Sequence, residues 1–179
     1  MSDDEALLSA LRAIRARGAI GEVSLEQAIV HAEQFVAALP AEVGTLIDLG
    51  SGGGLPGLVI ALRRPEVYVT LVERRQSRAD LLSRAVRSLG LSAHVAVRAT
   101  DVRIVAELSH GTFDVVTARS FAAPSITARW AGVLLRAGGR LVVSEPPIDD
   151  VDRWPVRLLA SSGLVDLGRD QGVRIFVRL

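Results

Sequence analysis

A glycine-rich segment flanked by two acidic residues has the residue types and spacing that best support chemistry in this sequence. Asp48 comes just before five glycines that fall within residues 50–57, and Glu73 follows about 20 residues further on. Glycine allows positive φ and lets a backbone approach a ligand closely. An acid in the second position can accept hydrogen bonds from the vicinal hydroxyls of a ribose. The segment therefore predicts a site for an adenosine-containing cofactor.

Two cofactors compete for this site. The spacing Gly52-x-Gly54-x-x-Gly57 fits the dinucleotide fingerprint and so allows NAD. However, the charge of Asp48 would oppose a bound pyrophosphate, whereas S-adenosylmethionine carries an ammonium and a sulfonium that a carboxylate favours. S-adenosylmethionine is therefore the predicted cofactor, and NAD is the less favoured alternative.

An arginine stands directly after a predicted apolar strand at residues 113–118. In open α/β sheets, ligands bind beyond the carboxyl ends of the strands, near the place where the strand order reverses. Arg119 is therefore predicted to reach the mouth of the site and to orient either the cofactor or the acceptor, without moving protons. Solvation of the sheet edge is the alternative role for this side chain.

These residues require strands, loops and helices in alternation to position them. The run 45–49 is apolar and bounded by glycine, which predicts a buried strand, and Pro56 suits the first position of the helix that follows. Such alternation indicates a Rossmann-like parallel sheet with helices on both faces. Further strands are predicted at 67–72, 93–97, 113–118 and 140–144, and helices at 3–17, 24–39, 102–108 and 124–135.

The C-terminal part departs from this alternation. A helix is predicted at about 148–161, followed by strands at 163–167 and 173–179 around a polar turn at 168–172. Two strands joined by a tight turn form an antiparallel hairpin, and a parallel sheet closed in this way is typical of adenosylmethionine-dependent methyltransferases. The predicted fold is therefore a mostly parallel, seven-stranded class I methyltransferase sheet, which is a second argument against NAD.

Composition limits the remaining possibilities. The 179 residues suit a single methyltransferase domain over 1–179, with residues 1–40 as a helical extension packed on it. The absence of cysteine excludes disulfides and thiolate metal sites, and no metal site is predicted. An acidic N-terminus and the lack of a long apolar run predict a cytoplasmic protein without a membrane span. All 21 basic residues are arginine, which fits either codon usage in a GC-rich genome or bidentate phosphate contacts.

The residue sequence of the glycine loop is more specific than its glycine spacing. Asp-Leu-Gly-Ser-Gly-Gly-Gly-Leu-Pro-Gly, residues 48–57, resembles the loop of the RsmG (GidB) family of small-subunit ribosomal RNA methyltransferases, and the resemblance extends from about His31 to Gly139. It implies transfer of a methyl group from S-adenosylmethionine to N7 of a guanine, with small-subunit rRNA or a ribosomal particle as partner. Because N7 already carries a free lone pair, this reaction requires no general base.

The resemblance also implies which residues hold the cofactor. An Arg-x-acid sequence holds the adenine edge in the family, and here Arg98 is followed by Ala99, Thr100 and Asp101. Thr100 occupies the place of the acid, and Asp101 can instead cap the helix at 102–108. The residues implied in cofactor binding are Asp48, Gly50, Ser51, Gly52, Gly54, Leu55, Glu73, Ala99, Thr100, Asp101 and Arg119.

Three positions depart from the family pattern. Val30 replaces the usual arginine ahead of His31, Ser77 replaces a lysine, and Glu145 stands where the fifth strand ends in Lys-Gly in the family. An anion in place of a cation at the rim should weaken phosphate or guanine binding. Two alternatives therefore stay open: a methyltransferase of the same fold with a small-molecule or protein substrate, and a non-catalytic module that binds adenosylmethionine or RNA.

Overall fold

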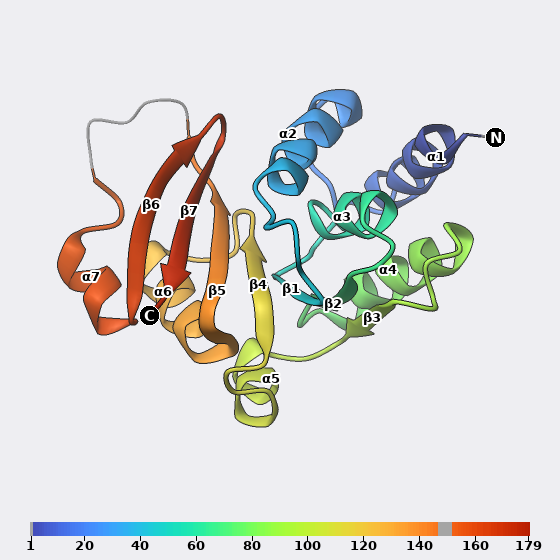
Figure 1. Cartoon of the computed structure of the whole chain (residues 1–179). Helices are drawn as coiled ribbons and strands as arrows, with labels where there is room; N and C mark the ends of the chain where they lie inside the picture. Colours follow the sequence, from blue (N-terminus) through green and yellow to red (C-terminus); the bar gives the residue numbers. More distant parts are fainter. Residues whose placement is uncertain (1, 147–151) are drawn as a thin grey trace.

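The protein is built on one twisted, mixed sheet (Figure 1). The computed structural model describes residues 2–146 and 152–179. The strands lie in the order β3-β2-β1-β4-β5-β7-β6; β1 to β5 are parallel, and β7 runs antiparallel to both of its neighbours. The predicted Rossmann-like class I methyltransferase sheet with a C-terminal hairpin is thus confirmed. The strands are β1 Thr45–Leu49, β2 Tyr68–Val72, β3 Val95–Arg98, β4 Phe113–Ala118, β5 Leu135–Ser144, β6 Leu164–Asp170 and β7 Val173–Arg178.

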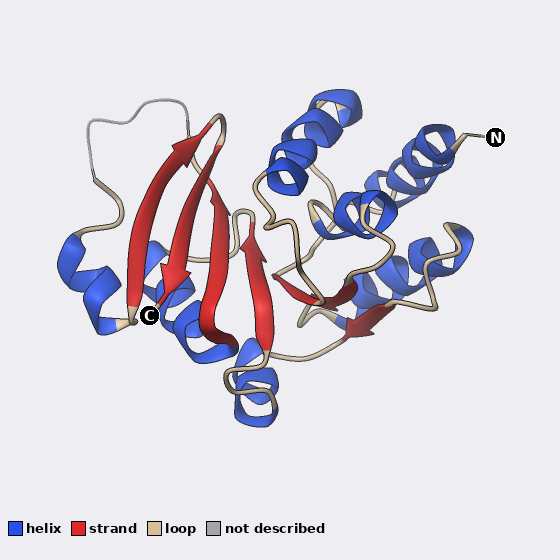
Figure 2. Cartoon of the chain, in the orientation of Figure 1, coloured by secondary structure: helices blue, strands red, loops and turns tan. Residues whose placement is uncertain are grey.

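Helices cover both faces of the sheet, because successive strand residues point to opposite sides. Leu46 belongs to the apolar cluster under one helical layer, and its neighbour Ile47 belongs to the cluster under the other. Figure 2 shows the two layers in blue around the red strands. The first layer contains α1 Asp3–Arg15, α2 Leu25–Ala37, α3 Gly57–Arg63 and α4 Gln76–Ser88; the second contains α5 Val102–Leu108, α6 Pro124–Leu134 and α7 Val156–Ser161.

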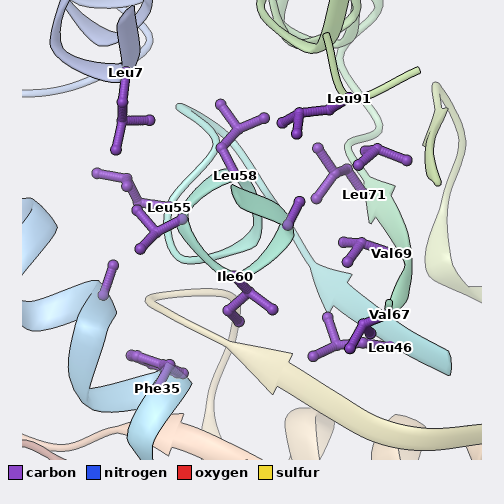
Figure 3. Packing of buried hydrophobic residues seen from close by; sticks show 14 of the residues in the cluster. Leu7, Phe35, Leu46, Leu55, Leu58, Ile60, Val67, Val69, Leu71 and Leu91 are labelled. Carbon is purple, nitrogen blue, oxygen red and sulfur yellow. The ribbon is translucent and has the colours of Figure 1, made fainter. Parts of the chain in front are cut away.

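The two N-terminal helices share the core of the first layer. Leu7 of α1 and Phe35 of α2 are fully buried in the cluster that surrounds α3 (Figure 3). Arg63 of α3 joins the two helices by polar contacts, since it donates to Asp4 at 2.5 Å and to Glu33 at 2.8 Å. In the described parts of the chain, no helix has the length and apolar character needed to cross a membrane.

Three element boundaries differ from the sequence prediction. Strand β5 begins at Leu135 rather than at residue 140, because a register irregularity against β4 lets residues around Gly138, at φ +75°, continue the strand. The hairpin turn is shorter than predicted, since β6 continues to Asp170 and leaves only residues 171–172 between the strands. Pro56 is the N-cap of α3 rather than its first helical residue.

The C-terminal helix is also shorter than predicted. Of the range 148–161, residues 148–151 lie outside the described residues, and the helix itself begins at Val156 with Pro155 as its N-cap. The preceding Trp154 is only 3% exposed and packs on Phe176, with ring centroids 4.8 Å apart. Residues 152–155 are not helical, which agrees with the restriction that Pro155 places on the residue before it.

Candidate functional site

The site lies where the strand order reverses, between β1 and β4. Leu49 and Ala118 are paired across these strands, so that Gly50 and Arg119 leave the sheet side by side at its carboxyl edge. From this point the chain leads to β2 on one side and to β5 on the other. This is the position at which open α/β sheets bind ligands.

The glycine loop is packed closely on both sides. Gly50 has φ +65°, and a Cβ added there would lie 2.7 Å from Cδ2 of Phe121. A Cβ on Gly53 would lie 2.2 Å from Cγ1 of Ile20, in the connection between α1 and α2. Larger residues would therefore displace either the β4–α6 connection or the N-terminal helices.

Asp48 lies beneath this loop rather than on a cavity wall. Its carboxylate is 1% exposed; Oδ1 accepts a 2.7 Å hydrogen bond from the Thr117 hydroxyl, and Oδ2 is buried without a partner among the described residues. Burial raises the pKa of Asp48 to about 6, although the Thr117 hydroxyl and the Arg119 charge favour the ionised form. At neutral pH a negative charge therefore lies directly under the loop.

Glu73 connects the loop to the end of β2. Its carboxylate accepts hydrogen bonds from the amides of Gly52 at 3.2 Å and Arg75 at 2.8 Å, and the residue is 6% exposed. It lines a cavity of about 440 Å³, whose walls include Gly50, Thr100 and Asp101 from the predicted set. Each carboxylate oxygen keeps a lone pair for a further donor. The cavity has the size and the acid that an adenosine requires.

The remaining predicted residues are distributed over four places. Asp101 is the N-cap of α5, where it accepts from the amide and from Nε of Arg103, and these bonds lower the pKa of Asp101. Ala99 lines a different cavity, beside α5, and not the one that contains Glu73. Ser51, Gly52 and Leu55 line a third cavity of about 290 Å³, which also contains Arg119. Gly54 packs against Leu58 and Leu82 beneath the loop.

Arg119 is a half-buried cation between two cavities. It makes no hydrogen bond or ion pair with the described residues, and burial lowers the pKa of its guanidinium while Asp48 opposes that shift. It lines the 290 Å³ cavity over the glycine loop and a larger one of about 620 Å³. The next residue, Ser120, has φ +54°, a backbone conformation that few non-glycine residues adopt.

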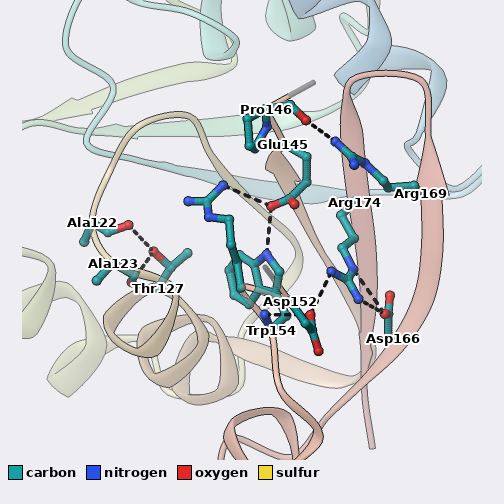
Figure 4. Close-up of polar contacts among 11 residues, drawn as sticks. Ala122, Ala123, Thr127, Glu145, Pro146, Asp152, Trp154, Asp166, Arg169 and Arg174 are labelled. Atoms are coloured by element: carbon teal, nitrogen blue, oxygen red, sulfur yellow. Dashed lines mark hydrogen bonds and ion pairs between the residues drawn. The ribbon is translucent and has the colours of Figure 1, made fainter. Parts of the chain in front are cut away.

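The 620 Å³ cavity is lined by polar groups from four parts of the chain. His31 of α2 faces Arg119 here, and burial together with the Arg119 charge lowers the pKa of His31. Glu145, the anion that the sequence places after β5, also lines this cavity, and it is paired. Its side chain is 6% exposed and accepts from Nε1 of Trp154 at 2.8 Å and from Nη1 of Arg153 at 3.4 Å (Figure 4).

Sequence reasoning missed the aromatic side chains of the site. Phe121, Ile126 and Trp130 form the apolar wall of the cavity that contains Glu73. Trp154 closes the 620 Å³ cavity. A signal was available, because the chain has only two tryptophans and each of them lines one of the two cavities.

The sheet order, the glycine loop after β1 and the acid after β2 define a Rossmann-like protein of the class I methyltransferase fold. The sequence profile of the GidB family, described as rRNA small subunit methyltransferase G, matches residues 19–145. The chain belongs to this family. The matched range includes the glycine loop, Glu73 and Arg119, and it ends at Glu145, so that Arg153 and Trp154 lie beyond it.

Individual relatives agree with this assignment. The ribosomal RNA small subunit methyltransferase G of Mycobacterium sp. (strain KMS) is 36% identical over 127 residues, which are 68% of this chain and 54% of the relative. The chain thus spans about half the length of this curated relative. Among solved structures, an O-methyltransferase family protein from Burkholderia thailandensis has a TM-score of 0.69 at 16% identity, covering 83% of this chain and 55% of its own. A geranyl diphosphate methyltransferase in complex with SAM has a TM-score of 0.61 at 22% identity, and the match covers 77% of this chain and 65% of that one.

Proposed function

We propose that this protein transfers a methyl group from S-adenosylmethionine to N7 of a guanine in small-subunit rRNA. The observation that carries the proposal is the place of Arg119, an unpaired cation among the described residues, between the cavity over the glycine loop and a second cavity. A transferase needs its cofactor and its acceptor in adjoining spaces. Membership of the GidB family supports rRNA as the acceptor.

The cofactor fits the residues of the 440 Å³ cavity, which shares Gly50, Arg78 and Ser120 with the cavity over the glycine loop. Glu73 can accept from the ribose hydroxyls, and Trp130 and Phe121 offer an apolar wall to the adenine. The buried charge of Asp48 under the loop favours a cationic ligand and disfavours a pyrophosphate. These features support S-adenosylmethionine over NAD, and the solved geranyl diphosphate methyltransferase that holds SAM shares the fold.

The chemistry asks little of the protein beyond positioning. When bound, the cofactor supplies a methyl group on a sulfonium, which is attacked by the lone pair of N7. No proton has to be removed before this attack, so the reaction does not require a general base. Arg119 is suited to hold the O6 edge of guanine, and alignment of the reacting atoms alone can contribute roughly 7–11 kcal/mol.

Two measurements test the proposal. Calorimetry should detect S-adenosylhomocysteine binding and no NAD binding. The protein is incubated with labelled S-adenosylmethionine and either purified small subunits or protein-free rRNA. A nuclease digest of the rRNA from at least one of these substrates should contain labelled N7-methylguanine. Label found in proteins or small molecules and never in RNA would overturn the acceptor, and NAD binding without S-adenosylhomocysteine binding would overturn the cofactor.

A further inference from the structure

The cavity beyond Arg119 contains a carboxylate that the proposed methyl transfer does not use. Glu145 directly follows β5, and its backbone amide donates to the carbonyl of Gly172 in the hairpin turn at 2.9 Å. Its Oε1 accepts both described side-chain bonds, from Trp154 and Arg153. Its Oε2 accepts none from the described residues, and it is not among the polar atoms sealed from solvent without a partner. Glu145 lines the 620 Å³ cavity, and Oε2 is the oxygen that can serve a ligand there.

This carboxylate is held by a chain of contacts from the C-terminal hairpin. Trp154 packs on Phe176 of β7, and its backbone amide donates to Asp152 at 3.0 Å. Arg174 of β7 donates to Asp152 at 3.4 Å and also pairs with Asp166 of β6 (Figure 4). Trp154, whose indole donates to Glu145, is thus held both by its ring and by its backbone amide. A group fixed in this way is pre-organised for recognition.

Beside Glu145 the cavity favours a hydrogen-bond donor, because the group there is a carboxylate. A carboxylate accepts only; Oε1 already receives two bonds, and the two lone pairs of Oε2 can receive a pair of N–H donors. Guanine presents such a pair, N1–H and the 2-amino group, next to O6. Arg119, which lines the same cavity, offers donors for O6. On the purine, N7 lies on the other side of O6 from N1, and Arg119 also lines the cavity over the glycine loop.

We propose that Glu145, held by Trp154 and Arg153, recognises the N1–H and 2-amino edge of the acceptor base in the 620 Å³ cavity. This inference rests on the proposed function, because it takes this cavity as the acceptor site. It makes the C-terminal hairpin, which lies beyond the matched family range, part of acceptor specificity. Acceptors with a guanine edge are favoured, and hypoxanthine, which lacks the 2-amino group, is disfavoured.

Nucleotide binding to the whole protein saturated with S-adenosylhomocysteine tests this inference without methyl transfer. Saturation-transfer NMR titrations with GMP and with IMP should show that GMP binds at least about tenfold more tightly. Glu145→Gln replaces one acceptor oxygen by an amide donor and should remove this preference. Glu66→Gln is the matched control: this acid also pairs with an arginine, but it precedes β2 at the opposite edge of the sheet, and the preference should remain.

Trp154→Phe provides a second variant, because it removes the indole donor and keeps a ring against Phe176. It should reduce the GMP preference while S-adenosylhomocysteine affinity stays unchanged, even if Glu145→Gln proves unstable. Absence of GMP binding to the parent, equal binding of GMP and IMP, or a preference that survives in both variants would overturn the inference. A protein that prefers GMP but methylates no RNA would overturn the proposed function and leave the base recognition intact.

Discussion

Thr117 and Asp48 face each other across β4 and β1, the two strands between which the strand order reverses, and they are joined by a hydrogen bond of 2.7 Å. Both residues are at most 1% exposed. Because the acceptor is a buried carboxylate, the bond is of the charge-assisted kind when Asp48 is ionised. It joins the end of β1, from which the glycine loop begins, to the end of β4, from which Arg119 follows. The bond therefore fixes the glycine loop and Arg119 relative to each other.

Thr117→Val should lower the free energy of unfolding by about 1–3 kcal/mol at pH 7, since it leaves a buried carboxylate without its described donor. Urea denaturation measures this loss. Thr70→Val is the matched control, because the Thr70 hydroxyl of β2 makes no hydrogen bond with the described residues, and a change within about 0.5 kcal/mol is expected. Equal losses in the two variants would show that the bond contributes nothing of its own.

The stability of the protein should depend on pH through Asp48. Burial raises the pKa of Asp48 from 3.8 to about 6 in the folded state, so the folded protein binds this proton more tightly than the unfolded chain. The stabilisation is complete below about pH 4 and is lost as the pH rises through about 6. At about 1.4 kcal/mol for each unit of pKa difference, the loss amounts to about 3 kcal/mol. Relative to Asp48→Asn, the parent should lose this amount between about pH 4 and pH 7, whereas a constant difference would contradict the prediction.

The central part of the fold could be predicted because local signals there are strong. The apolar run of β1 followed by glycines, and the apolar run of β4 ending at Arg119, fix strands, loop and switch point without long-range information. The C-terminal part could not be predicted in this way. Pro155 disfavours a helix at Trp154, but the packing of the indole on Phe176, which is far along the chain, has no local signal.

The charged residues of the site could be predicted from the sequence, but their pairing partners could not. Glu145 carries a negative charge in the sequence, and only the structure places Arg153 and Trp154 against it. Asp48 was predicted to favour a cationic cofactor by its charge, and only the structure shows that its side chain lies under the loop against Thr117. A strand period of two gives the face of a side chain but not its partners on neighbouring strands.

Gly53→Ala should disturb the contact between the glycine loop and the N-terminal helices. The added Cβ would lie 2.2 Å from Cγ1 of Ile20, and overpacking of this kind costs about 1–3 kcal/mol. Thermal unfolding and S-adenosylhomocysteine titration measure the effect, and Ile20→Ala in the same chain should restore part of it. Gly21→Ala, which meets nothing within 4 Å, is the control. If the double variant is no more stable than Gly53→Ala, the destabilisation does not come from the contact with Ile20.

Glu73→Ala should weaken S-adenosylhomocysteine binding by about 1.5–3 kcal/mol, the usual size for hydrogen bonds to a charged group. The loss includes the bonds from the amides of Gly52 and Arg75, which hold the loop before any ligand arrives. Calorimetry gives the dissociation constant, and Glu107→Ala on α5 serves as the control for removal of a surface acid. Unchanged affinity in Glu73→Ala would remove this acid from the cofactor site.

Arg119→Ala should raise the pKa of His31. The guanidinium opposes protonation of this imidazole across the 620 Å³ cavity, and its removal leaves only burial to lower the pKa. Titration of the ring protons by NMR measures the shift, and the chain has only three histidines to assign. Arg87→Ala, on the exposed face of α4, should leave the His31 titration unchanged.

The same variant separates the two roles open to Arg119. If the guanidinium holds the carboxylate of the cofactor, the dissociation constant for S-adenosylhomocysteine rises and single-turnover methylation recovers at saturating cofactor. If it holds O6 of guanine, the cofactor affinity stays normal while methylation falls at every cofactor concentration. We expect the cofactor effect to be the larger one, because Arg119 leaves the sheet beside Gly50 and lines the cavity over the glycine loop. A variant with parental binding, methylation and His31 titration would show that this cation only solvates the sheet edge.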